Sequence, residues 1–399
     1  MAEANSASSN GRCAPERSRS RSRSPESQND LQRAFPSAGT SRSSRSGVSD
    51  MRSVQAPSGS SQSKNIVFDS LSLSNDGFEK RITADQYMLR EVEYEIRGKI
   101  GEGSFGVVME GYDLSQQRSV AIKIIKQQRV KFVKREIYIL GLLAGKPNIV
   151  ELLDVLHDPL TDVPSFVFDY IRTDHWSQIY PSLTLGGIKS YAYQLLNALH
   201  HCRNSGILHR DIKPANILYD SILHKLVLID WGTADIWHPD KNSVYLVGTR
   251  EFRSPELLMQ CVRYDFSVDM WSAGCVIGQI ILGRDPLFGT SETNDKQLLR
   301  FVERYGEESM KSCLLEGLDK IRDTGTWKAA MDALSSLGSS PPKEWRSLGA
   351  KSCRQRIRDC EQHGLLTLLD NILQLNPSAR LLPADAMRHS FFANSSIVP

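Results

Sequence analysis

The most informative segment of this 399-residue chain, His209–Gly232, reads HRDIKPANILYDSILHKLVLIDWG. It combines the pattern H-R-D-x-x-x-x-N with a later D-W-G. Asp211 can accept a hydrogen bond from an attacking hydroxyl group, and Lys213 can neutralise a phosphoryl group in transfer. Asn216 and Asp230 offer an amide oxygen and a carboxylate to Mg²⁺, which needs few protein ligands when phosphate oxygens complete its shell. The segment therefore predicts phosphoryl-transfer chemistry.

A glycine-rich string, GEGSFGVV, lies upstream at residues 101–108. Glycines let a hairpin backbone approach phosphate groups without a clash from a Cβ atom. Dinucleotide-binding folds use a similar pattern at the start of a helix, whereas this string lies between two predicted strands. The position of the string between two strands favours a flap that covers a nucleoside triphosphate. We expect the flap to contact the nucleotide through Ile100, Gly101, Glu102, Gly103, Ser104, Phe105, Gly106, Val107 and Val108.

Lys123, in the strand-like sequence VAIK, is predicted to reach the α- and β-phosphate oxygens beneath this flap. A buried lysine needs a counter-charge, and Glu136 in the next helical stretch is the candidate partner. The alternative for such a pair is an ordinary contact on a helix surface. Ala121 is small enough to leave room for a planar base.

Periodicity predicts a two-part architecture. Alternating, β-branched residues predict three antiparallel strands over 92–126, a helix over 133–143 and strands over 148–170. From residue 185 onward the pattern is mostly helical, with Gly206 as a helix stop. A small β-rich part followed by a larger α-rich part predicts two lobes around a cleft, with order beginning near residue 85.

The amino-terminal region differs from the rest in composition. Residues 1–60 contain 17 Ser, nine Arg, five acidic residues and no Lys, and residues 17–25 read RSRSRSRSP. Such a segment cannot bury enough apolar surface to offset its conformational entropy, so we expect a disordered tail over residues 1–80. This cationic tail could contact RNA or acidic proteins, and serine phosphorylation would reverse its charge. A solvated tail without a dedicated role is the alternative.

Composition excludes several classes of protein. The net charge is +3, with 40% hydrophobic and 24% charged residues, as in an ordinary globular protein. No apolar run approaches the ~20 residues of a membrane span, and the first residues lack a secretory signal. Seven cysteines without a C-x-x-C pair argue against a disulfide framework. We expect the nucleus, the cytoplasm or both, with nuclear residence resting on the Ser/Arg tail.

These motifs, in this order, resemble the eukaryotic protein kinases over about residues 94–392. Ser254-Pro-Glu256 stands where the family has Ala-Pro-Glu, and Asp269 and Arg380 match markers of its second lobe. The resemblance implies an α+β bilobal fold, and a buried ion pair between Glu256 and Arg380. The implied regions are an N-lobe of about 94–168, a hinge at 169–173 and a C-lobe at 174–392.

Within that superfamily the chain looks most similar to the catalytic α subunit of casein kinase II. The sequences D-W-G, ADIWHPDK, KREIYILGLLAGKPNIVELLDVLHDP and DHWSQIYPSLT carry the similarity. It implies a serine/threonine kinase that uses ATP, and GTP as a candidate, with Mg²⁺. It also implies acidic protein substrates and a candidate regulatory β-type subunit, and Lys213 agrees with the choice of serine and threonine.

The resemblance also assigns further site residues. Adenine would lie between Ile100, Val108 and Ala121 on one side and Leu218 on the other. Phe168 would be the gatekeeper, and the backbone from Asp169 to Ile171 would form the hinge. Substrate would meet Thr249, Arg250 and Arg253.

The chain departs from casein kinase II at three places. Its flap has all three glycines, a lysine-rich run is thinned to Arg129, Val130, Lys131 and Phe132, and Leu246 replaces a third basic residue of the activation segment. We therefore expect a weaker preference for acidic substrates. Ser243, Tyr245 and Thr249 are candidate regulatory sites, although the first two are more simply ordinary loop residues and Thr249 a substrate contact.

Three alternatives remain open at this point. A pseudokinase scaffold would bind partners without catalysis, although every key catalytic position is filled. A splicing-related kinase would explain the Ser/Arg tail, although the catalytic segments match casein kinase II better. The tail could also act as an independent RNA-contacting module, which predicts a steep dependence of RNA binding on salt.

Overall fold

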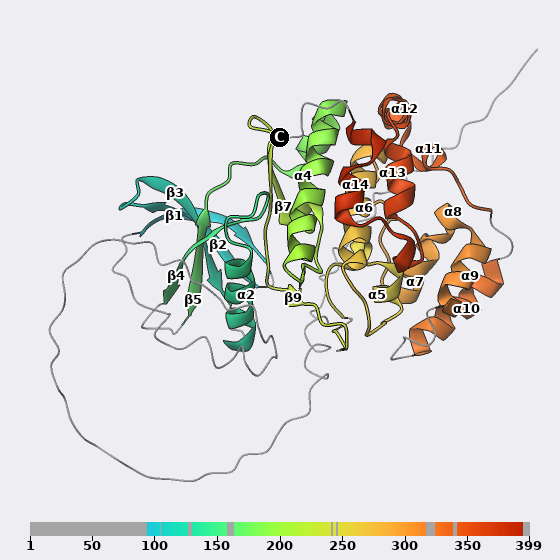
Figure 1. Cartoon of the computed structure of the whole chain (residues 1–399), viewed down its shortest axis with the longest axis horizontal. Coiled ribbons are helices and arrows are strands. Elements are labelled where there is room, and N and C mark those ends of the chain that lie inside the picture. The colour runs from blue at the N-terminus through green and yellow to red at the C-terminus, as the bar shows by residue number, and fades with distance from the viewer. Residues whose placement is uncertain are drawn as a thin grey trace, which may run out of the picture. The chain divides into compact units, whose positions relative to one another are not determined.

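The computed structural model describes residues 94–103, 105–126, 130–157, 163–240, 242–244, 246–316, 324–337 and 341–393. The predicted tail at 1–80, and the predicted start of order near residue 85, lie outside these ranges. The described residues form the predicted α+β bilobal fold, with a small sheet-containing N-lobe and a larger helical C-lobe (Figure 1).

The N-lobe is a five-stranded antiparallel sheet in the order β1-β2-β3-β5-β4. Its strands are β1 (Tyr94–Glu102), β2 (Gly106–Asp113), β3 (Arg118–Ile125), β4 (Leu152–His157) and β5 (Pro164–Asp169). Val120, Ile122 and Val167 form a buried cluster within this lobe. All five strands fall within the ranges that the sequence pattern predicts.

One helix, α2 (Val130–Leu142), packs beside this sheet (Figure 1). It starts three residues before the predicted helix. Its residue Val133 packs with Ile125 of β3 and Phe166 of β5 in a buried cluster. The face of the helix that carries Val133 and Ile139 is buried, and Glu136 is buried on it as well. Packing of this face therefore places a carboxylate inside the N-lobe.

The connection from α2 to β4 is anchored on the C-lobe. The side-chain amide of Asn148 donates to the carbonyl oxygen of Leu226 at 2.9 Å. Leu228 donates its N–H to the Asn148 carbonyl oxygen at 2.8 Å and accepts from Val150 at 3.1 Å. The end of α2 thus has a fixed attachment to the lobe that carries the catalytic loop.

The C-lobe holds the remaining helices and two short strand pairs. Its helices are α3 (Trp176–Ser182), α4 (Leu185–Asn204), α5 (Pro255–Leu258), α6 (Ser267–Leu282), α7 (Asn294–Arg300), α8 (Val302–Tyr305), α9 (Glu307–Glu316), α10 (Thr324–Leu337), α11 (Trp345–Leu348), α12 (Arg354–Gln362), α13 (Leu365–Ile372) and α14 (Pro383–Met387). The antiparallel pairs are β6 (Ile207–Leu208) with β9 (Asp235–Ile236), and β7 (Ile217–Asp220) with β8 (Lys225–Leu228). Short 3₁₀ turns occur at Pro214–Asn216, Arg250–Phe252, Lys351–Cys353, Pro377–Ala379 and Ser390–Phe392.

Local signals explain the ends of the longest helix, α4. The Thr184 side chain accepts a hydrogen bond from the N–H of Gly187, which satisfies one of the free donors at the helix start. Gly206, the predicted stop, adopts a left-handed φ of 70° just after the helix. Among the described residues, no helix has both the length and the apolar character needed to cross a membrane.

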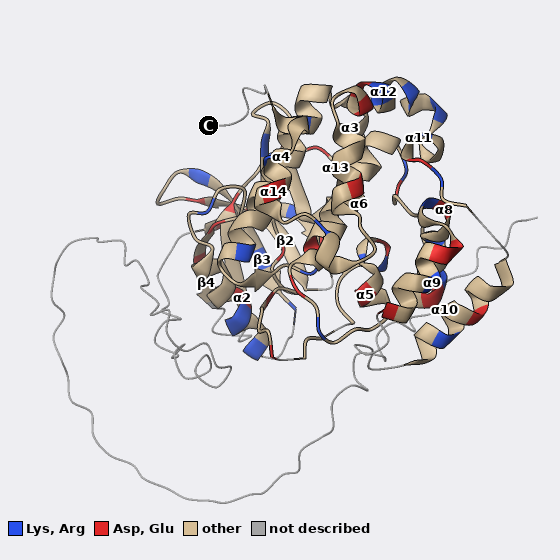
Figure 2. Ribbon diagram, turned by 45° about the vertical axis from the view of Figure 1, so that its right-hand side comes forward, with Lys and Arg blue, Asp and Glu red and all other residues tan. Residues whose placement is uncertain are grey.

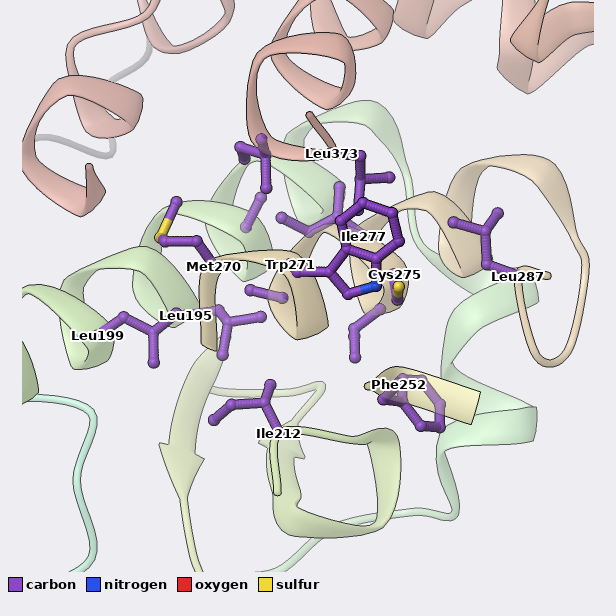
Figure 3. Close-up of a cluster of buried hydrophobic side chains, with 14 of the residues drawn as sticks. Leu195, Leu199, Ile212, Phe252, Met270, Trp271, Cys275, Ile277, Leu287 and Leu373 are labelled. Carbon is purple, nitrogen blue, oxygen red and sulfur yellow. The ribbon is translucent and has the colours of Figure 1, made fainter. Parts of the chain in front are cut away.

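Helix α6 is the centre of the C-lobe. All of its residues are buried, and most of them are apolar. Its Trp271, Cys275 and Ile277 lie among Leu195 of α4 and Leu373 near α13 (Figure 3). Several charged residues lie on the peripheral helices α9, α10 and α12 (Figure 2).

Close packing on α6 depends on two glycines. A Cβ atom on Gly274 would lie 2.7 Å from the Leu373 side chain, and one on Gly278 would lie 2.8 Å from Leu287. These spacings are shorter than real Cβ contacts, so larger residues would force the neighbouring segments away from α6.

Glu256 and Arg380 form the ion pair that the resemblance implies. Two parallel hydrogen bonds of 2.6 and 2.8 Å join the guanidinium to the carboxylate. Both side chains are almost fully buried, and Arg380 also lies 5.1 Å from the centre of the Trp271 ring. This geometry ties α5 to the segment before α14 across the core.

We expect Glu256→Gln to lower the free energy of unfolding by about 3–5 kcal/mol, because it leaves the Arg380 charge buried without a counter-ion. Denaturant unfolding of the full chain measures this change. Glu303→Gln is the matched control, because Glu303 pairs with Arg284 at the surface with a 41% exposed side chain, and its cost should stay below about 1 kcal/mol. Equal losses of unfolding free energy in Glu256→Gln and Glu303→Gln would contradict this role of the buried ion pair.

Candidate active site

The hairpin between β1 and β2 carries the predicted glycine flap. Its turn is closed by a hydrogen bond of 2.9 Å from the N–H of Gly103 to the carbonyl oxygen of Gly106. A Cβ atom on Gly106 would lie 2.4 Å from the carbonyl oxygen of Ile124. Glycine at position 106 is therefore required for the flap to pack on β3, while Ser104 lies outside the described residues.

The flap closes over the lysine of β3. The Phe105 ring lies 3.2 Å from the position that a Cβ atom on Gly232 would occupy. Lys123 Nζ is 5.9 Å from the centre of the same ring. Glu102 points elsewhere, because its carboxylate bonds Lys126 Nζ at 2.9 Å. Of these two predicted nucleotide contacts, Phe105 thus lies beside Lys123 and Gly232, and Glu102 is held by surface lysines.

Lys123 pairs with one carboxylate from each lobe, and its contact with Asp230 joins the two lobes. Its Nζ lies 2.8 Å from Glu136 Oε1 on α2 and 2.9 Å from Asp230 Oδ1 in the C-lobe. Burial disfavours the charge of Lys123, but the two carboxylates outweigh this effect and raise the pKa of Lys123 above its ordinary value. The lysine is therefore a fixed cation that can meet phosphate oxygens.

The predicted catalytic loop gathers its polar groups around Asp211. Lys213 Nζ lies 2.7 Å from Asp211 Oδ2 and donates to Thr249 Oγ1 at 2.9 Å. The Thr249 hydroxyl group donates to Asp211 Oδ1 at 2.8 Å. Asn216 Nδ2 donates to the backbone oxygen and to Oδ2 of Asp211, at 2.8 and 3.0 Å. Three residues predicted from sequence, Lys213, Thr249 and Asn216, thus meet at the Asp211 carboxylate.

Asp211 is ionised at neutral pH. Burial alone would raise its pKa, but the Lys213 charge and the hydrogen bonds from Lys213 and Thr249 lower the Asp211 pKa below its ordinary value. An ionised carboxylate accepts hydrogen bonds only. Asp211 can therefore orient a hydroxyl group that takes the place of the Thr249 hydroxyl in this network.

Asp269 holds the backbone of this loop. Its carboxylate oxygens accept the N–H groups of His209 and Arg210, both at 2.8 Å. Arg210 adopts a left-handed φ of 67°, which costs energy for a residue with a Cβ atom. The two hydrogen bonds stabilise this strained conformation, which directs the next residue, Asp211, into the cleft.

The residues predicted for the adenine pocket lie on both lobes. In the sheet, Ala121 of β3 is opposite Phe168 of β5, and Val108 of β2 is opposite Lys123. Val108, Ala121 and Phe168 are half-buried, as is Leu218 of β7 in the C-lobe. Ile100 is 47% exposed, so its side chain is the most open of the set.

The predicted hinge, residues 169–173, begins at the last residue of β5. The Asp169 carboxylate bonds Arg118 at 2.9 Å, so this side chain is held by β3. The backbone of Asp169 is then the part left for the predicted contact with a base, and Ile171 is half-buried beyond it.

A magnesium site would depend on few protein ligands. Within the described ranges, no group of three or more His, Cys, Asp or Glu side chains gathers as a metal site. Both hydrogen bonds of the Asn216 side chain run through Nδ2, which leaves its Oδ1 as a hard ligand. The Asp230 side chain is 25% exposed. These oxygens fit Mg²⁺ when a nucleotide supplies further ligands.

The activation segment carries the residues predicted to meet substrate. Arg250 donates to the Ser291 carbonyl oxygen at 3.0 Å, and Arg253 donates to the Gly248 carbonyl oxygen at 2.7 Å. Asn294 Oδ1 accepts from both guanidiniums, at 3.4 and 3.3 Å. Burial and the nearby Arg250 charge lower the pKa of Arg253 to about 10. The two guanidinium groups thus lie close together and donate their hydrogen bonds to neutral oxygen atoms.

The three candidate regulatory residues differ in their surroundings. The Ser243 N–H donates to the Val262 carbonyl oxygen at 2.7 Å, while Tyr245 lies outside the described residues. Thr249 is the residue already bonded to Asp211 and Lys213. Its position agrees with a substrate contact rather than with an accessible modification site.

Several residues around this site escaped the sequence analysis. Asn294 fixes both arginines but belongs to no motif, and Asp235 bonds Arg210 and Arg135 although only its place after D-W-G was visible. Arg210, the arginine of H-R-D, needs a nearby negative charge when it is buried. This need was the one signal that could have led to Asp235.

A comparison with family models agrees with this geometry. The model of the protein kinase domain matches residues 94–392, about three quarters of the chain. The match starts at the first residue of β1 and ends just after α14, so it covers the glycine flap, the Lys123–Glu136 pair and the catalytic loop. With the motifs, the bilobal fold and the family model in agreement, this chain belongs to the protein kinase family.

Proposed function

We propose that this chain is a serine/threonine protein kinase similar to casein kinase II α. A protein kinase domain implies an enzyme that transfers a phosphoryl group, in general from ATP with a divalent metal, to protein substrates. The finer proposal is that a serine or threonine hydroxyl group of the substrate accepts the phosphoryl group, and that acidic residues near this hydroxyl group are preferred.

The observation that carries the proposal is the triangle of Asp211, Lys213 and Thr249. An aliphatic hydroxyl group, that of Thr249, is held between the carboxylate at 2.8 Å and the ammonium at 2.9 Å. A substrate serine or threonine presents the same chemical group to the same partners. The arrangement therefore supports an aliphatic hydroxyl group as the acceptor.

The proposed reaction is an in-line displacement at the γ-phosphorus. The acceptor oxygen forms a bond to phosphorus, the bond to the ADP oxygen breaks, and the hydroxyl proton leaves toward Asp211. Asp211 orients the attacking hydroxyl group, Lys213 offsets charge on the phosphoryl oxygens, and Lys123 positions the α- and β-phosphates. Mg²⁺ held by Asn216 and Asp230 would add charge neutralisation at the phosphates.

Acidic preference is supported by Arg250 and Arg253. Neither guanidinium has a carboxylate within 4.0 Å among the described residues, and both rest on neutral oxygens. Arg250 directly follows Thr249 in the chain, and Arg253 lies four residues after Thr249. Leu246, which is 48% exposed, contributes no charge to this surface. We infer a preference for acidic substrates that is weaker than the preference that three basic residues would provide.

Other finer predictions rest on the sequence alone. They are the use of GTP, a regulatory β-type subunit, RNA or splicing-protein contacts through the Ser/Arg tail, and nuclear residence. A pseudokinase scaffold and a splicing-related kinase stay as rivals. Binding of ATP and Mg²⁺ without labelling of any substrate would favour the scaffold, and a preference for arginine around the acceptor would favour the splicing-related kinase.

We expect Asp211→Asn to lower the rate of phosphoryl transfer by about 10²–10⁴-fold, because the amide keeps the shape of the side chain but loses its charge. The measurement is labelling of a mixed serine/threonine peptide pool with radioactive ATP and Mg²⁺. Nucleotide affinity and the melting temperature should change little. A variant that kept most of the activity would overturn the assignment of Asp211.

We also expect a positional peptide array to select Asp and Glu near the acceptor, since Arg250 and Arg253 would pair with them. The double variant Arg250→Gln/Arg253→Gln should reduce this selection by about tenfold. The control is Arg263→Gln, an exposed arginine farther along the chain. An unchanged acidic preference in the double variant would contradict the role of these two arginines.

A further inference from the structure

The segment that contains α11 and α12 carries a surplus of positive charge. Residues 343–363 hold six Lys or Arg residues against three Asp or Glu residues, which gives this segment a net charge of +3. The whole chain has the same net charge, so the remaining residues of the chain are neutral in sum. Figure 2 shows blue basic positions on α12. A local surplus of this kind favours an anionic partner.

The three acidic residues of this segment already have partners within it. Glu344 and Glu361 both contact Arg346, at 3.2 and 2.6 Å. Asp359 accepts a hydrogen bond of 2.7 Å from the side-chain amide of Gln355. The carboxylates of the segment are thus engaged with partners other than its remaining cations.

Three cations at the start of α12 are exposed and have no counter-ion. Among the described residues, no carboxylate lies within 4.0 Å of the charged groups of Lys351, Arg354 and Arg358. The Arg358 guanidinium donates only to the neutral side-chain oxygen of Gln355. Like charges four residues apart on a helix repel each other, so Arg354 and Arg358 weaken α12 when no anion lies between them.

Helix α12 is nevertheless held firmly by its other side. Ile357 and Cys360 are buried in the core of the C-lobe. Arg356 donates to the carbonyl oxygens of Ile280 near the end of α6 and of Pro181 in α3. The exposed cations therefore stand on a helix whose position is fixed before any partner arrives.

The spacing of the cations matches an extended chain with anions at alternate positions. Residues three and four apart share one side of a helix, so Arg354 and Arg358 lie on one face, about 6 Å apart along the axis. Lys351 precedes them in the 3₁₀ turn Lys351–Cys353, where residues three apart also lie above one another. Alternate side chains of an extended peptide lie on one face about 6.8 Å apart. Neighbouring anions of such a peptide would meet the two arginines.

A phosphorylated serine/arginine repeat has this pattern. Residues 17–25 of the chain, which lie outside the described residues, show it in sequence as RSRSRSRSP, with serine at every second position. Each phosphoserine carries about −1.5 to −2 charges and three acceptor oxygens. Arginine binds phosphate through two parallel hydrogen bonds, which suits a surface where two of three cations are arginines. Without phosphate the same repeat is cationic and would be repelled.

A nucleic acid fits this surface less well. A protein that binds nucleic acid through the backbone commonly neutralises about 6–10 phosphates, whereas three cations would neutralise about three. Residues 351–358 also contain no aromatic side chain on which a base could stack. The short row of cations therefore favours a peptide.

We propose that Lys351, Arg354 and Arg358 form a docking surface for a phosphorylated serine/arginine repeat of a protein partner. This surface is separate from the proposed kinase reaction, because binding requires neither ATP nor the catalytic loop. It gives the C-lobe a means to select partners whose serines already carry phosphate.

The first test is fluorescence anisotropy with the full chain, treated with phosphatase so that its own serines carry no phosphate. The probe is a labelled RSRSRSRSP peptide in which every serine is phosphorylated, without nucleotide. It should bind at least about tenfold more tightly than the unmodified peptide. The variant Lys351→Gln/Arg354→Gln/Arg358→Gln should weaken binding by about 30-fold, because three charge-assisted contacts are lost.

The matched control removes three positive charges elsewhere on the C-lobe. Arg203→Gln/Arg263→Gln/Lys328→Gln changes exposed residues that are scattered over α4, the segment before α6, and α10. Because these positions are not adjacent, the Kd of the phosphopeptide should change by less than about twofold. Equal losses of affinity in the two triple variants would reduce the effect to net charge and refute a docking surface.

The second test locates the peptide on the unmodified protein by hydrogen exchange and mass spectrometry. Addition of the phosphopeptide should slow exchange in α12 by about threefold and leave α10 unchanged. This measurement needs no variant, so it stands even where the triple variant is less stable. Protection confined to other elements would place the peptide elsewhere and contradict the proposal.

Three further probes decide the chemistry of the partner. Equal affinity for the unmodified repeat would rule out a phosphate-dependent surface. A peptide with glutamate at every phosphoserine position, bound as tightly as the phosphopeptide, would also rule it out. A short single-stranded RNA that bound more tightly than the phosphopeptide, and lost its affinity in the Lys351→Gln/Arg354→Gln/Arg358→Gln variant, would assign the surface to nucleic acid instead. A chain that labels no peptide with ATP would refute the proposed function and leave these binding results unaffected.

Discussion

A single buried carboxylate, that of Asp269, connects the catalytic loop to the core. It lies in the first turn of α6, a helix without exposed residues, and burial raises its pKa above the ordinary value. The N–H groups of His209 and Arg210 satisfy it, each at 2.8 Å. Because an unsatisfied buried carboxylate is very costly, the core can close only around the strained loop that presents Asp211. The two hydrogen bonds of Asp269 thus contribute both to the stability of the core and to the geometry of the catalytic loop.

The cleft brings opposite charges from two lobes together. Lys123 of β3 meets Glu136 and Asp230, and Lys213 meets Asp211, so three carboxylates face two ammonium groups. This surplus of negative charge suits a divalent cation, and the two lysines suit the phosphates that accompany it. Asn148 adds a neutral attachment between the lobes, which fixes the end of α2 next to the C-lobe strands. The site is therefore organised by contacts on both sides of the cleft.

Residue order within motifs made much of the site predictable. A lysine in an apolar strand needs a buried partner, and Glu136 was found by this reasoning at 2.8 Å. The loop from His209 to Asn216 is short enough that its spacing alone places its side chains together. Asn294 shows the opposite case, since it is 41 residues from Arg253 and 44 from Arg250 and carries no pattern of its own. Contacts of that kind arise from packing of whole elements, which local periodicity does not encode.

The amino-acid sequence alone established the two lobes, the glycine flap and the identity of the groups around Asp211, because periodicity and motif spacing act over short stretches of chain. The tertiary structure decided which distant charges share a partner. Asp235 and Arg135 are a hundred residues apart in the chain, and their 3.4 Å contact exists because β9 and α2 pack together. The glycine-rich motif predicts that Glu102 contacts the nucleotide. In the structure its carboxylate accepts a hydrogen bond from Lys126, which directly follows β3. Coulomb attraction depends on distance in space, and only the folded chain sets that distance.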